Sequence, residues 1–245
     1  MRKIAIALSK GGVGKTTTAV NLAAGLAAQG RRVLLVDVDT QGHVARALGT
    51  APSQGLAELV SGEAPRESCI HTARPNLDLL AGGRSLAGLK RLITRQDFGG
   101  ERTLAEGIAK IDAPYEFVLL DTAPGWDALT VNALFYAEEV LAPVSLEALT
   151  LQGLNEFGRS MAAIQKYHAE LRLRYIVPTF YDRRVRKSEE ILAQLQQHYP
   201  AEVCAPVRYN VRLSEAPGYG QTIFEYAARS SGAEDYAALV ERILQ

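Results

Sequence analysis

The sequence predicts an α/β fold with a largely parallel, twisted sheet that is flanked by helices on both faces. Short runs rich in valine, isoleucine and leucine recur along the 245 residues, and longer stretches with apolar residues at helical spacing separate them. A glycine-rich segment lies between the first run and the first helical stretch, where a phosphate-binding loop of a P-loop fold would lie. These observations together predict the fold class.

The apolar runs are nearly continuous rather than alternating, which is typical of strands that are buried on both faces. They are "KIAIAL" (3–8), "RVLLVDV" (32–38), "NLDLLAG" (76–82), "EFVLLD" (116–121), "EVLAPVS" (139–145), "YIVPTF" (175–180) and "EVCAPV" (202–207). The helical stretches include residues 15–29, 127–137, 149–170 and 186–199. Their alternation predicts βαβ units with right-handed crossovers. We expect a single domain over residues 1–245, with residues 50–75 and 82–103 as excursions from its core.

Composition and charge exclude several classes of protein. The 27 basic residues balance 27 acidic ones, so binding to nucleic acid would require a local basic patch. Cys69 and Cys204 are far apart, which argues against a disulfide scaffold or a thiolate metal site. The N-terminus lacks the pattern of a signal peptide, and no apolar run reaches the length of about 18 residues that a membrane span needs. We therefore expect a soluble, cytoplasmic protein.

The segment "SKGGVGKTT" near the N-terminus predicts a site for a nucleoside triphosphate. Glycines at positions 11, 12 and 14 allow backbone N–H groups to turn toward an anion, and the following helix adds its partial positive charge. Lys15 can reach the β- and γ-phosphates, and the hydroxyl of Thr16 can bind Mg²⁺. The segment lies between a predicted strand and a predicted helix, and this position disfavours a glycine-rich turn that binds no ligand. A dinucleotide fingerprint is also disfavoured, because it needs a glycine where this chain has Thr17.

Three aspartates follow predicted strands. Asp37 and Asp39 come at the end of the second run, and Asp121 ends the run 116–121. Ligands of open parallel sheets bind at the carboxyl ends of the strands. A single aspartate at such a position is often a helix cap or a turn former. Three of them beside a phosphate loop predict a site that positions Mg²⁺ and a water molecule.

Three blocks of the sequence together resemble the ParA/Soj partition ATPases, which have a deviant Walker A motif and are related to the Min-system membrane ATPase. The blocks are "KGGVGKTTTAVNLAAGLAAQGRRVLLVDVDTQG", "FVLLDTAPG" followed by "LTVNAL", and "RYNVRLSEAPGYGQTI". The similarity spans nearly the whole chain. It implies a P-loop fold, ATP and Mg²⁺ as cofactors, and slow, partner-stimulated hydrolysis of ATP to ADP and phosphate.

The resemblance also implies roles for individual residues. Lys10 would reach across an ATP-bound homodimer to the phosphates of the other subunit. Asp39 would orient the attacking water, and Asp121 would hold Mg²⁺ through water. The implied catalytic residues are Lys10, Lys15 and Asp39, and the implied metal residues are Thr16, Asp39 and Asp121. The implied ATP-binding residues are Lys10, Gly11, Gly12, Val13, Gly14, Lys15, Thr16, Thr17, Arg208, Tyr209 and Asn210.

The chain departs from the family pattern in a few places. Thr40 stands where the family often has proline, Ala123-Pro124 where it often has two prolines, and Arg208-Tyr209 where Pro-Arg is expected. These departures leave every implied catalytic group in place, and they affect the contacts expected with adenine.

Residues 172–212 contain eight basic and four acidic side chains, a local surplus in a neutral protein. From composition alone, a solvated helix face explains this cluster as well as a binding surface does. The resemblance implies that it binds double-stranded DNA without sequence preference. The predicted contacts are Arg184, Arg186, Lys187 and Arg212.

The tail "GAEDYAALVERILQ" tests the membrane alternative. It places Tyr236, Leu239, Val240, Ile243 and Leu244 on one face, with little basic charge, which predicts a core-packing helix rather than a membrane anchor. The resemblance therefore implies a nucleoid-associated protein that positions a chromosome, plasmid or protein organelle with a ParB-like or other small adaptor that has a basic N-terminus. The alternative is a nucleotide-switched scaffold that recruits a protein or membrane partner without DNA.

Overall fold

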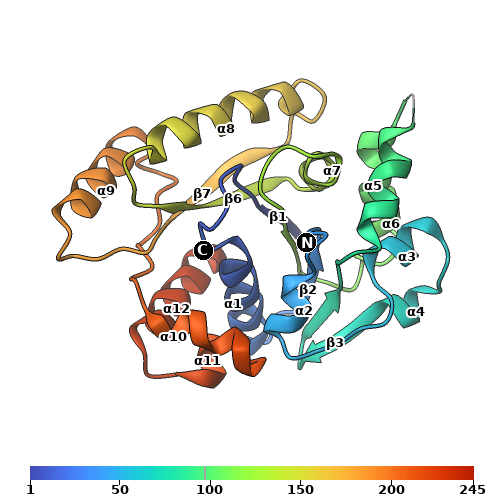
Figure 1. Cartoon of the computed structure of the whole chain (residues 1–245), viewed down its shortest axis with the longest axis horizontal. Helices are drawn as coiled ribbons and strands as arrows, with labels where there is room; N and C mark the ends of the chain where they lie inside the picture. The colour runs from blue at the N-terminus through green and yellow to red at the C-terminus, as the bar shows by residue number, and fades with distance from the viewer. Residues whose placement is uncertain (97) are drawn as a thin grey trace.

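A computed structural model describes residues 1–96 and 98–245. The strands are β1 (Arg2–Ile6), β2 (Val33–Asp37), β3 (Ile70–Arg74), β4 (Leu77–Leu80), β5 (Phe117–Asp121), β6 (Glu139–Ser145) and β7 (Arg172–Thr179). They form one sheet in the order β3-β4-β2-β5-β1-β6-β7 (Figure 1). Each neighbouring pair is parallel except β3 and β4, which are antiparallel. The predicted α/β fold with a largely parallel sheet is confirmed.

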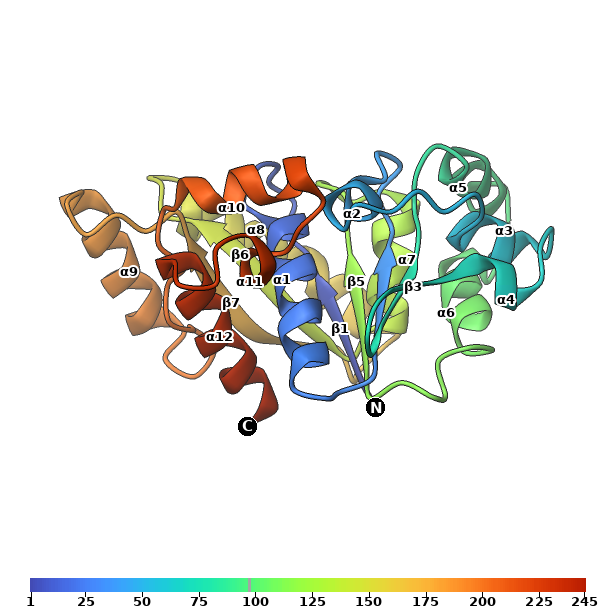
Figure 2. The same ribbon diagram turned by 90° about the horizontal axis from the view of Figure 1, so that it is seen from below.

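Helices cover both faces of this sheet (Figures 1 and 2). One face carries α1 (Lys15–Ala28), α2 (His43–Ala47), α11 (Ile223–Tyr226) and α12 (Ser231–Leu244). The other face carries α3 (Leu56–Ser61), α5 (Leu86–Thr94), α6 (Thr103–Ile108), α7 (Ala128–Tyr136), α8 (Thr150–Gln165) and α9 (Arg186–His198). The remaining short elements are α4 (Arg66–Cys69), α10 (Val211–Glu215) and the 3-10 turns η1 (Gly100–Arg102) and η2 (Ala216–Tyr219).

The central strands are buried on both faces, as their continuous apolar sequences predict. In β2, Leu34 and Val36 pack into the core cluster on the side of α5, α7 and α8. Val33 and Leu35 point the opposite way and pack with α1 and α12. A strand between two helical layers therefore needs no polar face.

Helix α12 packs against α1, so it is a core-packing helix, as the tail pattern predicts. Tyr236, Leu239, Val240 and Ile243 are buried. The tail pattern also places Leu244 on this face, but Leu244 is 36% exposed because it lies at the end of the last turn. In the part of the chain that the structure describes, no helix is both long enough and apolar enough to cross a membrane.

Two expectations about the elements need correction. The run 202–207 is not a strand, although Val203 in it forms a bridge to Ile176 of β7, and a second bridge joins Arg208 to Tyr181 just beyond both segments. Pro178 in β7 and Pro206 in the run have no N–H to donate, so the ladder of hydrogen bonds is interrupted. Residues 50–75 and 82–103, expected as excursions from the core, also contribute to it: Leu56 in α3 and Leu86, Leu89 and Ile93 in α5 are buried in the core cluster, while Asp97 lies outside the described residues.

Candidate active site

A cavity of about 550 Å³ opens at the carboxyl ends of the central strands. One end is lined by the glycine-rich loop after β1, by Thr16 at the start of α1 and by Asp39 after β2. The other end is mostly apolar and is lined by Phe180, Val207, Tyr209, Leu213 and Tyr236. The cavity therefore has a polar end that suits phosphate groups and an apolar end that suits an aromatic base.

The glycine-rich loop has the backbone conformation that an anion-binding turn needs. Gly12 and Gly14 have φ angles of 73° and 89°, in the left-handed region that side chains disfavour. Gly14 caps α1, so the free N–H groups of the first helical turn face the cavity. The hydroxyl of Thr179 at the end of β7 donates to the carbonyl oxygen of Val13 at 3.0 Å and fixes the loop from the opposite side.

The side chain of Lys15, at the end of the glycine-rich loop, reaches back to the start of the loop. Its Nζ donates to the carbonyl oxygen of Lys10 at 2.9 Å, and the side chain is largely buried. Burial lowers the pKa of this ammonium, and the nearby carboxylates of Asp121 and Asp39 oppose the effect. The ammonium is therefore preorganised inside the loop, where a phosphate group would lie.

The strand register brings two carboxylates together. Asp37 pairs with Asp121 across β2 and β5, so both lie at the same edge of the sheet. Thr16 donates its hydroxyl hydrogen to Asp121 Oδ2 at 2.7 Å. The other oxygen, Asp121 Oδ1, is buried and has no hydrogen-bond partner among the described residues. An unpartnered carboxylate oxygen beside a threonine hydroxyl fits the oxygen-rich, partly hydrated shell that Mg²⁺ prefers.

Asp37 and Asp39 have different surroundings although they are two residues apart. Asp37 is completely buried and accepts the backbone N–H groups of Asp39 at 2.9 Å and Val44 at 3.1 Å. Burial raises the pKa of Asp37 to about 7, and burial with the neighbouring Asp37 raises the pKa of Asp121. Asp39 is partly exposed and lines the cavity, and among the described residues its carboxylate accepts one hydrogen bond, from the N–H of Gln41 to Oδ1 at 3.0 Å. Asp39 is therefore the aspartate with a carboxylate available to a ligand or a water.

Lys10 contacts its own chain instead of the cavity. Its Nζ donates to Ser145 Oγ at 3.3 Å and forms an ion pair with Glu147, just beyond β6. The same contact holds the pKa of Glu147 below its usual value. Lys10 and Glu147 are both well exposed, so this ion pair has little strength and can open when another anion competes.

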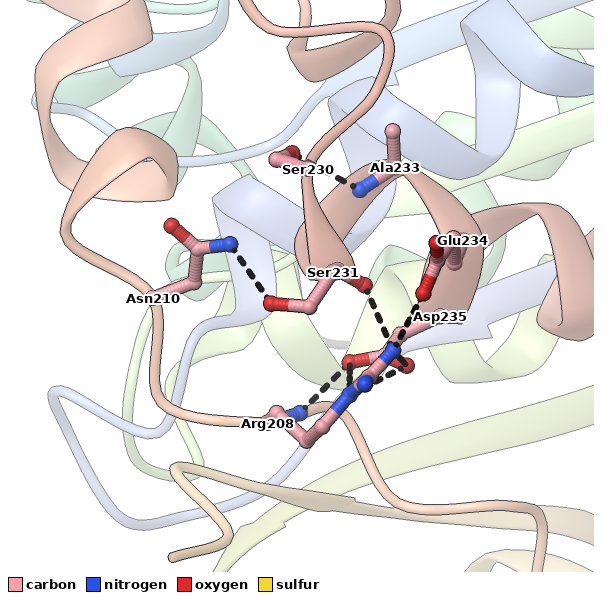
Figure 3. Close-up of polar contacts among 7 residues, drawn as sticks. All are labelled: Arg208, Asn210, Ser230, Ser231, Ala233, Glu234 and Asp235. Atoms are coloured by element: carbon pink, nitrogen blue, oxygen red, sulfur yellow. Dashed lines mark hydrogen bonds and ion pairs between the residues drawn. The ribbon is translucent and has the colours of Figure 1, made fainter.

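The predicted adenine-contacting segment lies at the apolar end of the cavity, but Arg208 is directed elsewhere. Figure 3 shows its guanidinium against Asp235 and Glu234 at the start of α12, with nitrogen–oxygen distances of 2.6 and 2.9 Å. The backbone N–H of Arg208 also donates to Asp235, and Asn210 donates to Ser231 Oγ at 2.9 Å. These hydrogen bonds raise the pKa of Arg208. They anchor the segment, and the side chain of Tyr209 lies at the rim of the cavity, where it is 65% exposed.

Each predicted DNA-contacting side chain lies beside a carboxylate. The pairs are Arg184 with Asp182 at 2.7 Å, Arg186 with Glu190 at 3.1 Å, Lys187 with Glu190 at 3.8 Å, and Arg212 with Glu215 at 3.0 Å. Arg184 and Arg186 are 82% and 91% exposed, so water screens their ion pairs strongly. The cluster remains accessible, and its role in binding DNA stays a prediction.

Sequence patterns missed three residues at the site. Glu147 and Asp235 come from distant parts of the chain, and no motif spacing links them to Lys10 or Arg208. Phe180 lines the cavity with a left-handed φ of 56°, a conformation that a phenylalanine disfavours and that no local sequence signal indicates.

Comparisons with known proteins identify the family of this chain. A family model described as an AAA domain matches residues 1–173. The chromosome-partitioning ATPase Soj of Thermus thermophilus is 39% identical over 246 residues, which cover 100% of this chain and 96% of that protein. The chromosome partitioning protein ParA of Caulobacter vibrioides is 35% identical over 252 residues, which cover 100% of this chain and 94% of that protein.

A solved structure is similar over the same extent. Cobyrinic acid a,c-diamide synthase of Mycobacterium smegmatis, with bound ADP and magnesium, superposes with a TM-score of 0.85 at 30% identity, covering 100% of this chain and 94% of the other. The sequence blocks, the parallel sheet and the full-length relatives agree, and the chain belongs to the ParA/Soj family of P-loop partition ATPases.

Proposed function

We propose that this protein is an ATP-driven switch that binds ATP with Mg²⁺, dimerises, and binds DNA without sequence preference in that state. Slow hydrolysis, stimulated by a partner, returns it to the free monomer. The observation that carries the proposal is the cavity, where the phosphate loop faces Asp39 and the Thr16–Asp121 pair. The ADP and magnesium bound to a solved relative support this pair of ligands.

The polar end of the cavity would hold the phosphates. The loop N–H groups and Lys15 would neutralise phosphate oxygens, and Thr16 and Asp121 would hold Mg²⁺, directly or through water. When bound, the metal ion would supply positive charge near the leaving ADP, which gains negative charge as the γ-phosphoryl group departs. The apolar end, with Tyr209 and Val207, suits the base of the nucleotide.

Asp39 would act on the attacking water. Its carboxylate is accessible from the cavity and accepts few hydrogen bonds from the protein, whereas both oxygens of Asp37 are occupied by backbone N–H groups. A carboxylate that accepts a hydrogen bond from water fixes the direction of attack. Asp39 is therefore the better candidate, and Asp37 is a positioning residue for the loop that carries it.

Lys10 would couple hydrolysis to dimerisation. In the monomer its ammonium pairs with Glu147, outside the cavity. Two triphosphates brought face to face in a dimer place a far larger negative charge near this exposed loop than one carboxylate does, so the ion pair would open and Lys10 would move to the partner's phosphates.

The proposed biological role follows from the family. Soj and ParA relatives are named for chromosome partitioning, which supports a protein that segregates or positions a cargo on the nucleoid. A small adaptor with a basic N-terminus is the expected stimulating partner. The exposed arginines at the start of α9 and in α10 support DNA binding through phosphate contacts.

DNA binding in different nucleotide states tests this proposal. We expect a fluorescently labelled duplex of arbitrary sequence to bind with Mg²⁺–ATP and to bind far more weakly with Mg²⁺–ADP. The double variant Arg186→Glu/Arg212→Glu should bind every sequence more weakly and with a smaller dependence on salt. Arg159→Glu/Lys166→Glu makes the same change in net charge, at an exposed position of α8 and at the exposed residue that follows this helix, and should behave like wild type.

Two results would contradict the proposal. Equal DNA affinity with ATP and ADP would remove the switch. ATP-dependent dimerisation without any binding to DNA would favour the alternative, a nucleotide-switched scaffold that recruits a protein or membrane partner.

A further inference from the structure

Helix α5 has two different faces. Leu86, Leu89 and Ile93 are buried against the core. The opposite face carries small, hydroxyl-bearing and basic side chains at helical spacing, namely Ala87, Lys90, Arg91 and Thr94, and Arg95 follows at the C-cap. Residues 86–95 include no acidic residue.

Those five residues and Thr40 line a shallow hollow of about 510 Å³, which we call the α5 surface. Lys90 forms an ion pair with Asp127 at 2.9 Å. Neither Arg91 nor Arg95 forms an ion pair with another of the residues that the structure describes. The hollow is therefore lined by guanidinium, ammonium and hydroxyl groups, which are the side-chain groups that contact phosphate oxygens.

The α5 surface is connected to the loop that carries Asp39. Thr40 lines the α5 surface and also belongs to the Asp39 loop, because it directly follows Asp39. The backbone N–H of Gly83, three residues before α5, donates to the carbonyl oxygen of Asp39 at 3.0 Å. Gly82 packs so closely that a Cβ there would lie 2.8 Å from the same oxygen. A change in the Asp39 loop on binding ATP would therefore reach α5 through backbone contacts.

We propose that the α5 surface is a second contact site for the phosphate backbone of DNA, and that its link to the Asp39 loop makes this contact depend on bound ATP. The inference rests on the proposed DNA-dependent function. Figure 2 shows α5, α2 and α10 along one edge of the molecule, and Arg212 belongs to α10. Arg46, exposed in α2, lies in the helix between them.

The lining favours a nucleic acid over an acidic protein segment. Protein interfaces are centred on buried aromatic or aliphatic anchors, which need an apolar pocket in the partner. Ala87 is the only apolar side chain that lines this hollow among the described residues. A surface of mixed cations and hydroxyls without such a pocket suits a regular row of phosphates.

Charge reversal on α5 tests the inference, with the full chain, Mg²⁺–ATP and a labelled duplex of arbitrary sequence. Arg91→Glu/Arg95→Glu should weaken DNA binding about tenfold or more. The slope of the logarithm of the affinity against the logarithm of the salt concentration should fall by the amount expected for the loss of about two phosphate contacts per protomer. Arg91→Lys/Arg95→Lys keeps the charge and should retain most of the affinity. Arg159→Glu/Lys166→Glu serves as the control for net charge, and binding of a fluorescent ATP analogue checks that each variant is folded.

The outcomes separate this inference from the proposed function. Wild-type affinity in Arg91→Glu/Arg95→Glu would overturn the α5 contact while leaving ATP-dependent DNA binding in place. If the same variant kept its DNA affinity but lost stimulation by the partner protein, the surface would be a docking site for that partner, which also overturns the inference. Wild-type protein that fails to bind DNA with ATP would overturn both proposals.

Discussion

The carboxylates of Asp37 and Asp39 differ in burial and in their hydrogen bonds, and therefore in the roles that they can have. Asp37 is completely buried and accepts two backbone N–H groups, so it shapes the loop after β2. Asp39 lies on that loop and lines the cavity. At the residue scale, the same type of side chain therefore serves as a support in one position and as a candidate catalytic group in the other.

Removing the Asp39 carboxylate separates the two roles. We expect Asp39→Ala to bind ATP with nearly unchanged affinity and to lower turnover by a factor of about 10²–10⁴, because the attacking water loses its hydrogen-bond acceptor. Single-turnover hydrolysis and titration with a fluorescent ATP analogue measure the two effects. If Asp39→Ala failed to bind ATP, Asp39 would be a structural or metal residue, and Asp37 or Asp121 would become the candidate for the water.

The buried carboxylates predict a pH dependence of stability in the absence of nucleotide and metal. Burial raises the pKa of Asp37 to about 7, whereas an unfolded aspartate has a pKa of about 3.9. Between these values the folded protein holds a proton that the unfolded chain releases. The contribution of this group to stability is therefore fully present below about pH 4 and is lost as the pH rises through about 7.

We expect wild-type protein to lose stability relative to Asp37→Asn as the pH rises from about 5 to about 7, by up to about 1.4 kcal/mol per pH unit. The asparagine cannot ionise, so its unfolding free energy lacks this contribution. Urea unfolding in EDTA at several pH values gives the difference between the two proteins. A constant difference across this range would show that Asp37 does not hold a proton in the folded state.

At the scale of elements, the turn between β4 and α5 holds the catalytic loop. A Cβ on Gly82 would lie 2.6 Å from the carbonyl oxygen of Asp37 and 2.8 Å from that of Asp39. Both obstacles are backbone atoms, so the loop itself would have to move. Gly88, six residues later in α5, has open space around its Cβ position.

These two glycines form a matched pair of variants. Gly82→Ala should lower ATP turnover by about a hundredfold, because a displacement of about 1 Å in a reacting group has an effect of this size. Gly88→Ala should turn over ATP as wild type does and should stabilise α5 slightly. Steady-state phosphate release measures both. Wild-type turnover in Gly82→Ala would show that the turn does not position Asp39.

At the scale of the whole molecule, sequence patterns predict the central strands of the sheet and the site residues that lie at the ends of those strands or in local motifs. The continuous apolar run at 32–38 predicts a central strand, and the rule that parallel strands bind ligands at their carboxyl ends predicts that Asp121 approaches the phosphate loop. The structure confirms the strand and places the hydroxyl of Thr16 against Asp121.

Contacts that depend on tertiary packing were not predictable. The ion pair of Lys10 with Glu147 joins side chains 137 residues apart in the sequence, and neither residue type signals the other. The run 202–207 resembles a strand in composition, but the missing N–H groups of Pro178 and Pro206 matter only once the two segments lie together. A single domain over residues 1–245 stays a prediction, and one cooperative unfolding transition would support it.

On dimerisation Lys10 would leave Glu147 and couple ATP binding to contact between two subunits. Light scattering after size-exclusion chromatography in Mg²⁺–ATP measures this coupling, with Asp39→Ala as the background that prevents hydrolysis. Asp39→Ala should elute at twice the monomer mass with ATP and at the monomer mass with ADP. Adding Lys10→Ala should leave ATP binding intact and restore the monomer, whereas Lys15→Ala should abolish ATP binding itself. A Lys10→Ala protein that dimerises with ATP as its parent does would contradict the account.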